Sequence, residues 1–318
     1  MVAGQGAVSG RAQFVQMALD RAAVVEQAGL DLDAQDATHR LVQARHRDLA
    51  RLQRLLELRL VAVPQPHVRL DLGELLERGH AELQKFGGNI SHDTVESLSR
   101  PSEQAPWQIR LTDDTLLESR HALVATGLTD KLPEVPGLSD LWGTRIFHCP
   151  YCHGHEVKGK KVALIGGANP PFTIRISKLL SKWTSTLTFY PNGLELTGLD
   201  RTQLAGLGVE INDAKVTQVQ PDQASPTGVE VHSADGVSIY EACFTGPDFL
   251  PNDALLRDAG CESANGWVKA ERGQTSVSRL WAAGNVVSSP DQVSQAMGSG
   301  AAVGIAIDQC MLDEDLAK

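Results

Sequence analysis

The chain lacks an excess of positive charge, a long hydrophobic run and a dense set of cysteines. Its formal net charge of −10 over 318 residues argues against nucleic acid or an anionic membrane as the main partner. No apolar run is long enough to span a bilayer, and residues 1–6 lack the basic start and apolar core of a signal peptide. Five cysteines with one closely spaced pair argue against a disulfide framework. We therefore expect a cytoplasmic protein whose partners are neither nucleic acid nor membrane.

Aromatic residues are also scarce, at 5% of the chain, whereas glycine occurs 29 times. A hydrophobic fraction of 42% with 21% charged residues is typical of a globular protein. The length allows two domains of ordinary size, each with its own core. The many glycines favour nucleotide-binding α/β units with tight turns.

The most informative stretch is residues 147–156, Phe-His-Cys-Pro-Tyr-Cys-His-Gly-His-Glu, followed by an apolar strand that ends at Gly166 and Gly167. Three interpretations compete for it. Cys-x-x-Cys-His matches the attachment motif of c-type haem, the histidines with the cysteines could form half of a metal site, and Cys-Pro-x-Cys matches a thiol–disulfide exchange motif.

The surrounding sequence favours the redox interpretation of Cys149 and Cys152. Attachment of haem c requires export, and the sequence shows no export signal. A closed zinc site needs four ligands, and the other three cysteines are isolated from one another. A dithiol beside a nucleotide-type strand and glycine turn indicates electron transfer between a redox cofactor and the dithiol. We assign no metal site.

Periodicity and turn residues predict the elements along the chain. Helices are expected at 37–60 (Arg-rich and amphipathic), 70–86, 173–183 and 293–311. Strands are expected at 107–111 and 116–118 (a hairpin), 162–165, 186–190, 229–231 and 239–244, and strands that run into turns are expected within 121–127 and 280–287. Pro133, Pro136, Gly137 and Gly246-Pro247 mark linkers.

A weak dinucleotide signature lies near the N-terminus. Gly4 and Gly6 open a turn, a helix-like run and a short apolar segment follow, and Glu26 stands where an acid would meet a ribose. Ser9 replaces the third glycine of the pattern, and almost no strand precedes Gly4.

Over about residues 72–306 these motifs, in order, resemble the low-molecular-weight thioredoxin reductases, within the pyridine nucleotide-disulfide oxidoreductases. The similarity is greatest to the subgroup with the motif Cys-Pro-Tyr-Cys-His-Gly, which includes dithiol oxidases. The segments that carry it are Ala125-Thr126-Gly127, Cys149–Gly154, Gly166-Gly167 with its strand, and Ala283-Gly284-Asn285.

The resemblance implies an α/β fold of two Rossmann-like, three-layer ββα dinucleotide-binding domains, the second inserted into the first. The expected boundaries are 1–130 for the first part of an FAD-binding domain, 131–246 for an inserted NAD(P)-type domain with the dithiol, and 247–318 for the second FAD-binding part. It also implies a homodimer that acts on a dithiol or disulfide, either a thioredoxin-like protein or a small molecule.

The resemblance assigns roles residue by residue. Cys152 would face the flavin, Cys149 would form the mixed disulfide with substrate, and His153 would replace the usual aspartate as acid and base, since imidazole titrates near neutrality. The expected FAD-binding residues are Gly4, Gly6, Glu26, Ala125, Thr126, Gly127, Gly284, Asn285, Gln292 and Val293.

Two departures from the family qualify these expectations. Pro170 and Pro171 follow the glycine turn and lack N–H donors, and no basic clamp for a 2′-phosphate follows the next strand, so use of NAD(P)H is doubtful. Residues 1–70 do not match the family: either FAD binds weakly, or the segment is diverged or read in a shifted frame. The favoured function is an FAD-dependent thiol–disulfide oxidoreductase; the alternative is a catalytically degenerate scaffold that binds or regulates.

Overall fold

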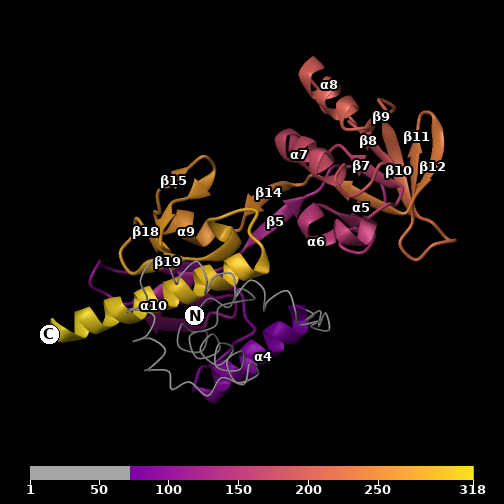
Figure 1. The fold of residues 1–318 in the computed structure, drawn as a ribbon. Helices are drawn as coiled ribbons and strands as arrows, with labels where there is room; N and C mark the ends of the chain where they lie inside the picture. The colour runs from indigo at the N-terminus through magenta and orange to yellow at the C-terminus, as the bar shows by residue number, and fades with distance from the viewer. Residues whose placement is uncertain (1–71, 318) are drawn as a thin grey trace, which may run out of the picture. The chain divides into compact units, whose positions relative to one another are not determined.

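The computed structural model describes residues 72–317, which divide into two compact units. Residues 72–127 and 253–317 form the first unit, and residues 128–252 form the second (Figure 1). The second unit is therefore an insertion within the first.

A five-stranded parallel sheet in the order β6-β13-β7-β8-β9 is the centre of the inserted unit. Its strands are β6 (Ile146–Phe147), β7 (Val162–Ile165), β8 (Leu187–Tyr190), β9 (Glu210–Ile211) and β13 (Ala242–Thr245). All four residues of β7 are buried, and they alternate between two core clusters: Ala163 and Ile165 belong to one, Val162 and Leu164 to the other. Burial on both faces explains why β7 is uniformly apolar.

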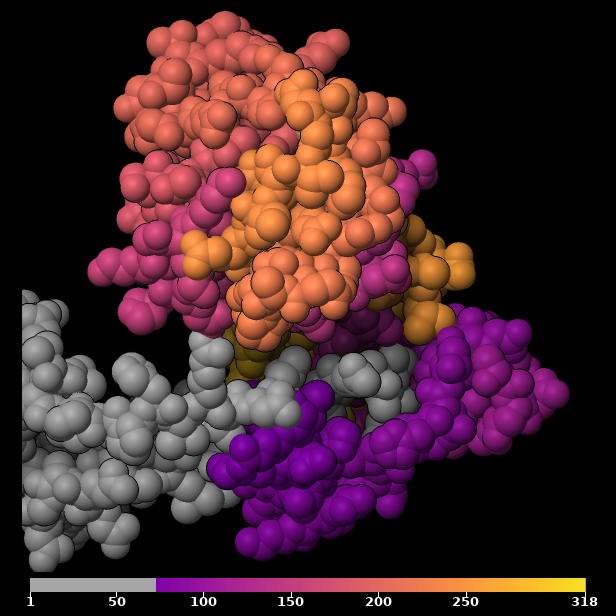
Figure 2. Space-filling model, turned by 90° about the vertical axis from the view of Figure 1, so that its right-hand side faces the viewer, coloured from indigo at the N-terminus to yellow at the C-terminus, as the bar shows by residue number. Residues whose placement is uncertain are grey.

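The two faces of this sheet are covered differently. Helices α7 (Pro170–Leu180) and α8 (Gly198–Gly206) contribute Ile176, Leu180 and Leu204 to the cluster on one side. The other cluster includes residues of a three-stranded antiparallel sheet, β10 (Val216–Pro221), β11 (Val229–Ser233) and β12 (Gly236–Tyr240). Atoms of this outer sheet form much of the orange surface in Figure 2. The layers are thus sheet, sheet and helices, as expected of a ββα dinucleotide fold.

Short elements complete the inserted unit. Strands β5 (Leu128–Lys131) and β14 (Asp248–Pro251) form an antiparallel ribbon from its first and last residues. Helices α5 (Leu138–Leu141) and α6 (Pro150–His153) and the 3₁₀ turn η1 (His155–Val157) precede β7.

The first unit is built from small sheets around one apolar core. Helix α4 (Leu72–Lys85) precedes an antiparallel sheet of β1 (Val95–Ser99), β2 (Trp107–Leu111) and β3 (Leu116–Ser119). A second sheet has the order β17-β18-β19-β4, from Ala270–Glu271, Gln274–Thr275, Leu280–Ala282 and Ala122–Val124. Helix α9 (Ala254–Asp258) and the strand pair β15 (Ser263–Ala264) and β16 (Trp267–Val268) follow the inserted unit in sequence and precede β17.

The first unit ends with the 3₁₀ turn η2 (Gly284–Val286) and the long helix α10 (Val293–Leu316). Val303 of this helix packs in a small cluster with Trp281 and Ala283, beside β19. Although α10 is long, neither it nor any other helix in residues 72–317 is apolar enough over its length to cross a membrane.

Most predicted elements of the described region are present, and they differ from the prediction mainly at their boundaries. Helix α7 begins at Pro170 rather than residue 173, because proline is tolerated in the first helical turn. The strand expected at 239–244 is two strands, β12 and β13, which belong to different sheets and meet at Glu241. Helix α10 continues to Leu316, beyond the predicted end at residue 311.

Candidate functional site

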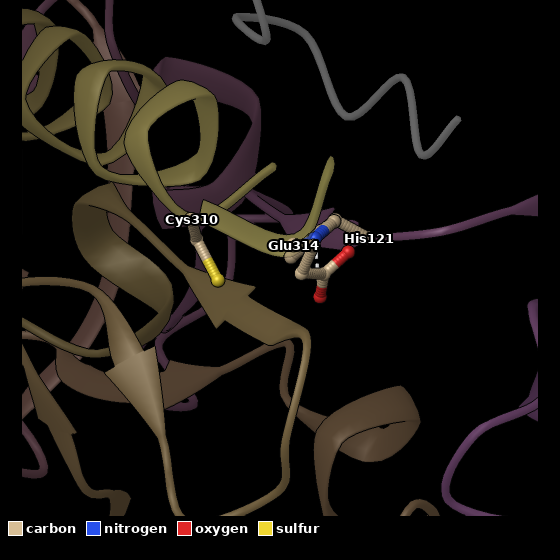
Figure 3. Close-up of side chains that lie close together, drawn as sticks. All are labelled: His121, Cys310 and Glu314. Carbon is tan, nitrogen blue, oxygen red and sulfur yellow. Dashed lines mark ion pairs between the residues drawn. The ribbon is translucent and has the colours of Figure 1, made fainter. Parts of the chain in front are cut away.

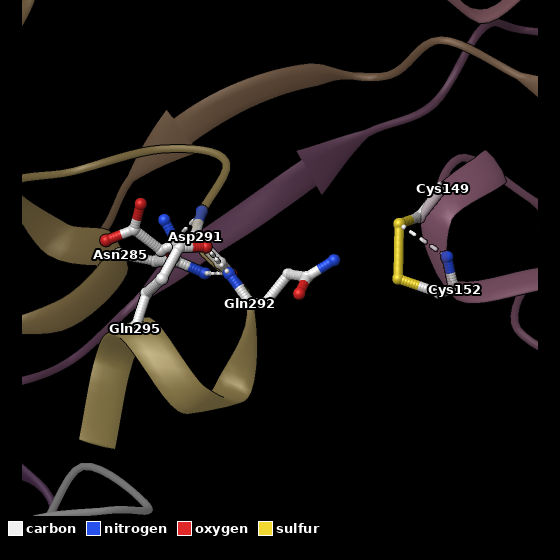
Figure 4. The surroundings of a disulfide bond; sticks show 6 residues. All are labelled: Cys149, Cys152, Asn285, Asp291, Gln292 and Gln295. Atoms are coloured by element: carbon white, nitrogen blue, oxygen red, sulfur yellow. Dashed lines mark hydrogen bonds between the residues drawn. A yellow bond between two sulfur atoms is a disulfide. The ribbon is translucent and has the colours of Figure 1, made fainter. Parts of the chain in front are cut away.

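The Cys149–Cys152 pair forms a disulfide across the start of helix α6 (Figure 4). Cys149 is the N-cap residue, Pro150 occupies the first helical turn, and the two Cα atoms are 5.3 Å apart. The Cys149 sulfur accepts a hydrogen bond from the Cys152 backbone N–H at 3.2 Å. Cys152 is exposed and Cys149 is half-buried, so neither half of the disulfide is enclosed in the core.

The other three cysteines are chemically different. Cys243 is fully buried, which raises the pKa of its thiol to about 12. Cys261 is also buried, and its pKa is raised for the same reason, whereas Cys310 is half-buried. A raised pKa leaves little thiolate near neutrality, so Cys243 and Cys261 are suited to packing and not to exchange.

His153 closes the redox turn with its ring against an aromatic side chain. The His153 and Phe147 rings stack with centroids 4.1 Å apart and planes 19° apart. The next residue must be small: a Cβ on Gly154 would overlap the Pro150 carbonyl and crowd the Trp183 indole. The glycine of the motif therefore allows the turn to pack against Trp183.

A second histidine, His148, lies immediately before the disulfide and is enclosed by aromatic rings. Its ring stacks on Trp142 with centroids 5.6 Å apart. The ring centroids of Phe172 and Phe249 lie 6.3 and 5.8 Å from that of His148. Burial lowers the pKa of His148, and the nearby Asp130 carboxylate acts in the opposite direction. Burial raises the pKa of Asp130, and the nearby His148 and Trp142 side chains act in the opposite direction. Sequence analysis did not identify this pair.

A small apolar hollow lies beside the redox turn. Its volume is about 280 Å³, and its lining residues are Pro150, Tyr151, Leu179, Lys182 and Trp183. Tyr151, between the two cysteines, is 65% exposed and contributes to this surface. The hollow offers apolar contact next to the disulfide.

Two of the predicted FAD-binding turns lie side by side in the first unit. Strands β4 and β19 are parallel partners, with Val124 opposite Ala282, so both strands end at the same edge of the sheet. The turn at residues 125–127 and the turn at Gly284 follow these ends. Gly127 and Gly284 have φ values of +70° and +72°, and added Cβ atoms would meet open space and Ala296, respectively. Glycine is needed at both turns for backbone conformation.

Asn285 joins the second turn to the start of helix α10 (Figure 4). Its side-chain oxygen accepts from the Asp291 backbone N–H at 3.0 Å, and its Nδ2 donates to the Asp291 carbonyl at 3.3 Å. Gln292 is the N-cap, and its backbone N–H donates to the Gln295 side chain. Val293 begins the helix and is 48% exposed. Asn285 therefore positions the helix start, where first-turn N–H groups have no intrahelical acceptor.

The glycine turn after β7 is closed by the protein itself. A Cβ on Gly166 would overlap the Pro191 carbonyl, and a Cβ on Gly167 would overlap the Gly246 carbonyl. Close packing of backbone on backbone thus requires both glycines, whether or not a ligand binds here.

The N-terminus of α7, which follows this turn, has few donors to offer. Pro170 and Pro171 have no N–H. The N–H groups of Phe172 and Thr173 donate to the side chain and carbonyl of Asn169, at 3.2 and 2.9 Å.

One group within residues 72–317 combines metal-ligating side chains: His121, Cys310 and Glu314 (Figure 3). Trp281 Nε1–H donates to His121 Nδ1 at 3.1 Å, so in the neutral ring Nε2 carries the proton. That nitrogen faces Glu314 Oε1 at 3.4 Å. A neutral histidine ligand needs the opposite tautomer, and Glu314 is already paired with Arg120 and Arg279. The cluster is an ion-pair network that connects α10 to the sheet.

Gly4, Gly6, Glu26 and the helix expected at residues 37–60 lie outside the described residues.

A family model described as pyridine nucleotide-disulphide oxidoreductase matches residues 192–300. The chain is 30% identical over 201 residues to an alkyl hydroperoxide reductase protein of Xanthomonas campestris pv. phaseoli, covering 61% of this chain and 38% of that protein. It is 27% identical over 243 residues to a thioredoxin reductase of Gibberella zeae, covering 64% and 70%. The crystal structure of HlmI matches with a TM-score of 0.74 at 33% identity, covering 79% and 80%. The chain spans less than half the length of the alkyl hydroperoxide reductase proteins that it matches.

Proposed function

Since the chain belongs to the thioredoxin reductase-like family of pyridine nucleotide-disulphide oxidoreductases, we propose that it is an FAD-dependent thiol–disulfide oxidoreductase. In this proposal the Cys149–Cys152 pair passes electrons between the flavin and a dithiol or disulfide substrate. The observation that carries the proposal is the disulfide itself, held in a short helical turn with neither cysteine buried.

The exchange chemistry balances within the dithiol and the protein. One substrate sulfur attacks Cys149, forms a mixed disulfide and releases the Cys152 sulfur. The second substrate sulfur then attacks the mixed disulfide and releases Cys149, so the substrate loses two electrons and the protein disulfide gains them. Protons from the substrate thiols end on the protein thiols or on a base, and His153 is the proposed base.

The described residues fit their half of an FAD site. Gly127 and Gly284 shape adjacent turns at one sheet edge, and Asn285 fixes the start of α10, whose first N–H groups can donate to a ligand. When bound, FAD supplies or accepts the electron pair. We propose that Gln292 and Val293 approach it through their backbone and that Asn285 acts by holding them.

We further propose that the electrons do not come from NAD(P)H. A dinucleotide pyrophosphate is normally bound by free N–H groups at a helix N-terminus after a glycine turn. At α7 the first two residues are prolines, and Asn169 occupies the next two N–H groups. A different electron source fits this turn better. It is either a dithiol substrate, with oxygen as the final electron acceptor, or a separate reductase.

The substrate we propose is a dithiol or disulfide, either on a thioredoxin-like protein or in a small molecule, and the working assembly is a cytoplasmic homodimer. The deciding experiment reconstitutes the full chain with FAD and adds a dithiol anaerobically. Bleaching of the flavin bands in the wild type, and its loss in Cys149→Ser and Cys152→Ser, is the expected result. Flavin binding without bleaching, or no flavin binding at all, would instead favour a catalytically degenerate scaffold.

A further inference from the structure

His148 connects the redox turn to the ribbon made by the two ends of the inserted unit. It precedes Cys149 directly, and its ring contacts Phe249 on β14. Phe249 is the cross-strand partner of Asp130 on β5. Directly opposed residues of an antiparallel pair share a face, so Asp130 lies on the face of the ribbon that carries Phe249, the ring that His148 contacts.

Asp130 is the charged group that acts on His148. The other rings around the imidazole, those of Trp142, Phe172 and Phe249, are uncharged. On β5, Thr129 and Lys131 are exposed whereas Asp130 is half-buried, as strand alternation requires.

Other charged groups near in sequence are directed elsewhere. Asp248 precedes Phe249 and therefore lies on the opposite face of β14. Arg145 donates to the carbonyls of Asp222, Ser225 and Gly228. After His148, the titratable groups of the redox turn are Cys149 at the N-cap of α6 and Tyr151, Cys152 and His153 within the helix.

The carboxylate of Asp130 is incompletely satisfied. Its Oδ1 is buried and makes no hydrogen bond within the described residues. A buried carboxylate oxygen without a donor is costly unless a proton or a cation can approach it. The His148 imidazole is the neighbour that can supply either one.

We propose that Asp130 and His148 form a carboxylate–imidazole pair that takes up a proton when the Cys149–Cys152 disulfide is reduced and releases it when the disulfide reforms. This inference rests on the redox role proposed above. A disulfide is neutral, so the enclosed His148 ring remains neutral beside it. Reduction by a dithiol transfers two electrons and two protons. If one protein thiol then ionises, its proton moves to His148, and Asp130 stabilises the resulting imidazolium.

The pair thereby favours the thiolate that exchange chemistry requires. A cation next to Cys149 lowers the pKa of the dithiol, and the lower pKa raises the fraction of reactive thiolate near neutrality. His148 therefore acts through the dithiol, by placing a positive charge next to Cys149. This role is distinct from that of His153, the proposed acid and base.

The test follows the imidazole directly. The full chain, with its ten histidines labelled at the ring carbons, is titrated by NMR in the oxidised state and in the state reduced by dithiothreitol. His148→Phe, which retains an aromatic ring in the box, assigns the His148 signal. Asp130→Asn retains the shape of the carboxyl group and removes its charge. His155→Gln is the matched control, since His155 is an exposed histidine of the same segment.

We expect the His148 proton-binding constant to be at least about tenfold larger in the reduced protein, which is one pKa unit. Asp130→Asn should reduce this difference, and His155→Gln should leave it unchanged. Alkylation of the reduced dithiol at pH 7 should slow about tenfold in His148→Phe.

Equal His148 titration in the two redox states would overturn the inference, even if one variant fails to fold, because it is measured in the wild type. Mass analysis of the same samples separates this result from failure of the proposed function. If Cys149 and Cys152 cannot be cycled between disulfide and dithiol, the redox role itself is wrong.

Discussion

The side-chain oxygen of Asn169 accepts a hydrogen bond from the Phe172 backbone N–H at 3.2 Å. This bond takes one of the donors that a pyrophosphate would need, and Pro170 and Pro171 remove two more. We predict that NADPH and NADH reduce the protein inefficiently. Anaerobic stopped-flow spectroscopy of the FAD-loaded chain is the measurement, with a dithiol as the positive control. Rapid bleaching by micromolar NADPH would contradict the prediction.

His153 offers a test of proton transfer at the dithiol. Replacing it with alanine should lower thiol turnover roughly 10²–10⁴-fold if proton transfer is limiting. Because the ring stacks on Phe147 at 4.1 Å, His153→Phe is the matched variant that retains the packing and removes the acid and base. Both variants should lose turnover to a similar extent while FAD binding is retained. Recovery of activity in His153→Phe would show that the ring acts only through packing.

Asn285 should control FAD binding through the Asp291 backbone. Asn285→Leu removes both hydrogen bonds, each worth about 1 kcal/mol, and frees the segment before α10. We expect FAD affinity to be lost in this variant. Asn285→Asp should be intermediate, because a carboxylate can still accept from the N–H but repels the Asp291 carbonyl. Fluorescence titration with FAD gives the two affinities, and wild-type binding in Asn285→Leu would remove the residue from the site.

The glycine turn after β7 should tolerate no side chain. Gly167→Ala places a methyl group against the Gly246 carbonyl and should destabilise the protein by about 1–3 kcal/mol. Gly206, at the end of α8, has open space around it, so Gly206→Ala should be neutral or stabilising by about 0.5–1 kcal/mol. Urea unfolding of both variants compares them, and equal stabilities would show that the turn can relax.

The buried His121 predicts a loss of stability in mild acid. Burial lowers its pKa below the ordinary value of 6.5, with Arg279 and Arg120 acting in the same direction and Glu314 opposing them. The unfolded chain therefore binds the proton more readily, and stability falls as the pH drops below about 6.5. His121→Gln should flatten the dependence of the unfolding midpoint on pH between 7 and 5. A wild-type slope in this variant would assign the effect to other groups.

The sequence predicted those parts of the fold that depend on local pattern. The apolar run of β7 and the hairpin of β2 and β3 lie where expected, because alternation and turn residues determine them. The start of α7 was misplaced at residue 173, although proline suits a first helical turn and the helix begins at Pro170.

Site residues were predictable only where chemistry is concentrated in sequence. Cys149 and Cys152 form a recognisable motif, and the turns at Gly127 and Gly284 follow strand-like segments. The pairing of Asp130 with His148 depends on the register of β5 against β14, which brings distant segments together. The signal that could have indicated His148 is its position directly before the redox-active Cys149.

The contrast between the five cysteines has an analytical consequence. Cys243 and Cys261 are buried with raised pKa values, so a thiol reagent added to the folded protein reaches them slowly. Cys310 adds the same number of alkyl adducts in either redox state. Unfolding a reduced molecule exposes all five thiols, and the fully alkylated chain then serves as an internal standard. Mass spectra of briefly alkylated protein should therefore separate into discrete populations two adducts apart. The ratio of these populations reads the oxidised fraction of a mixed sample directly, without purification of either form.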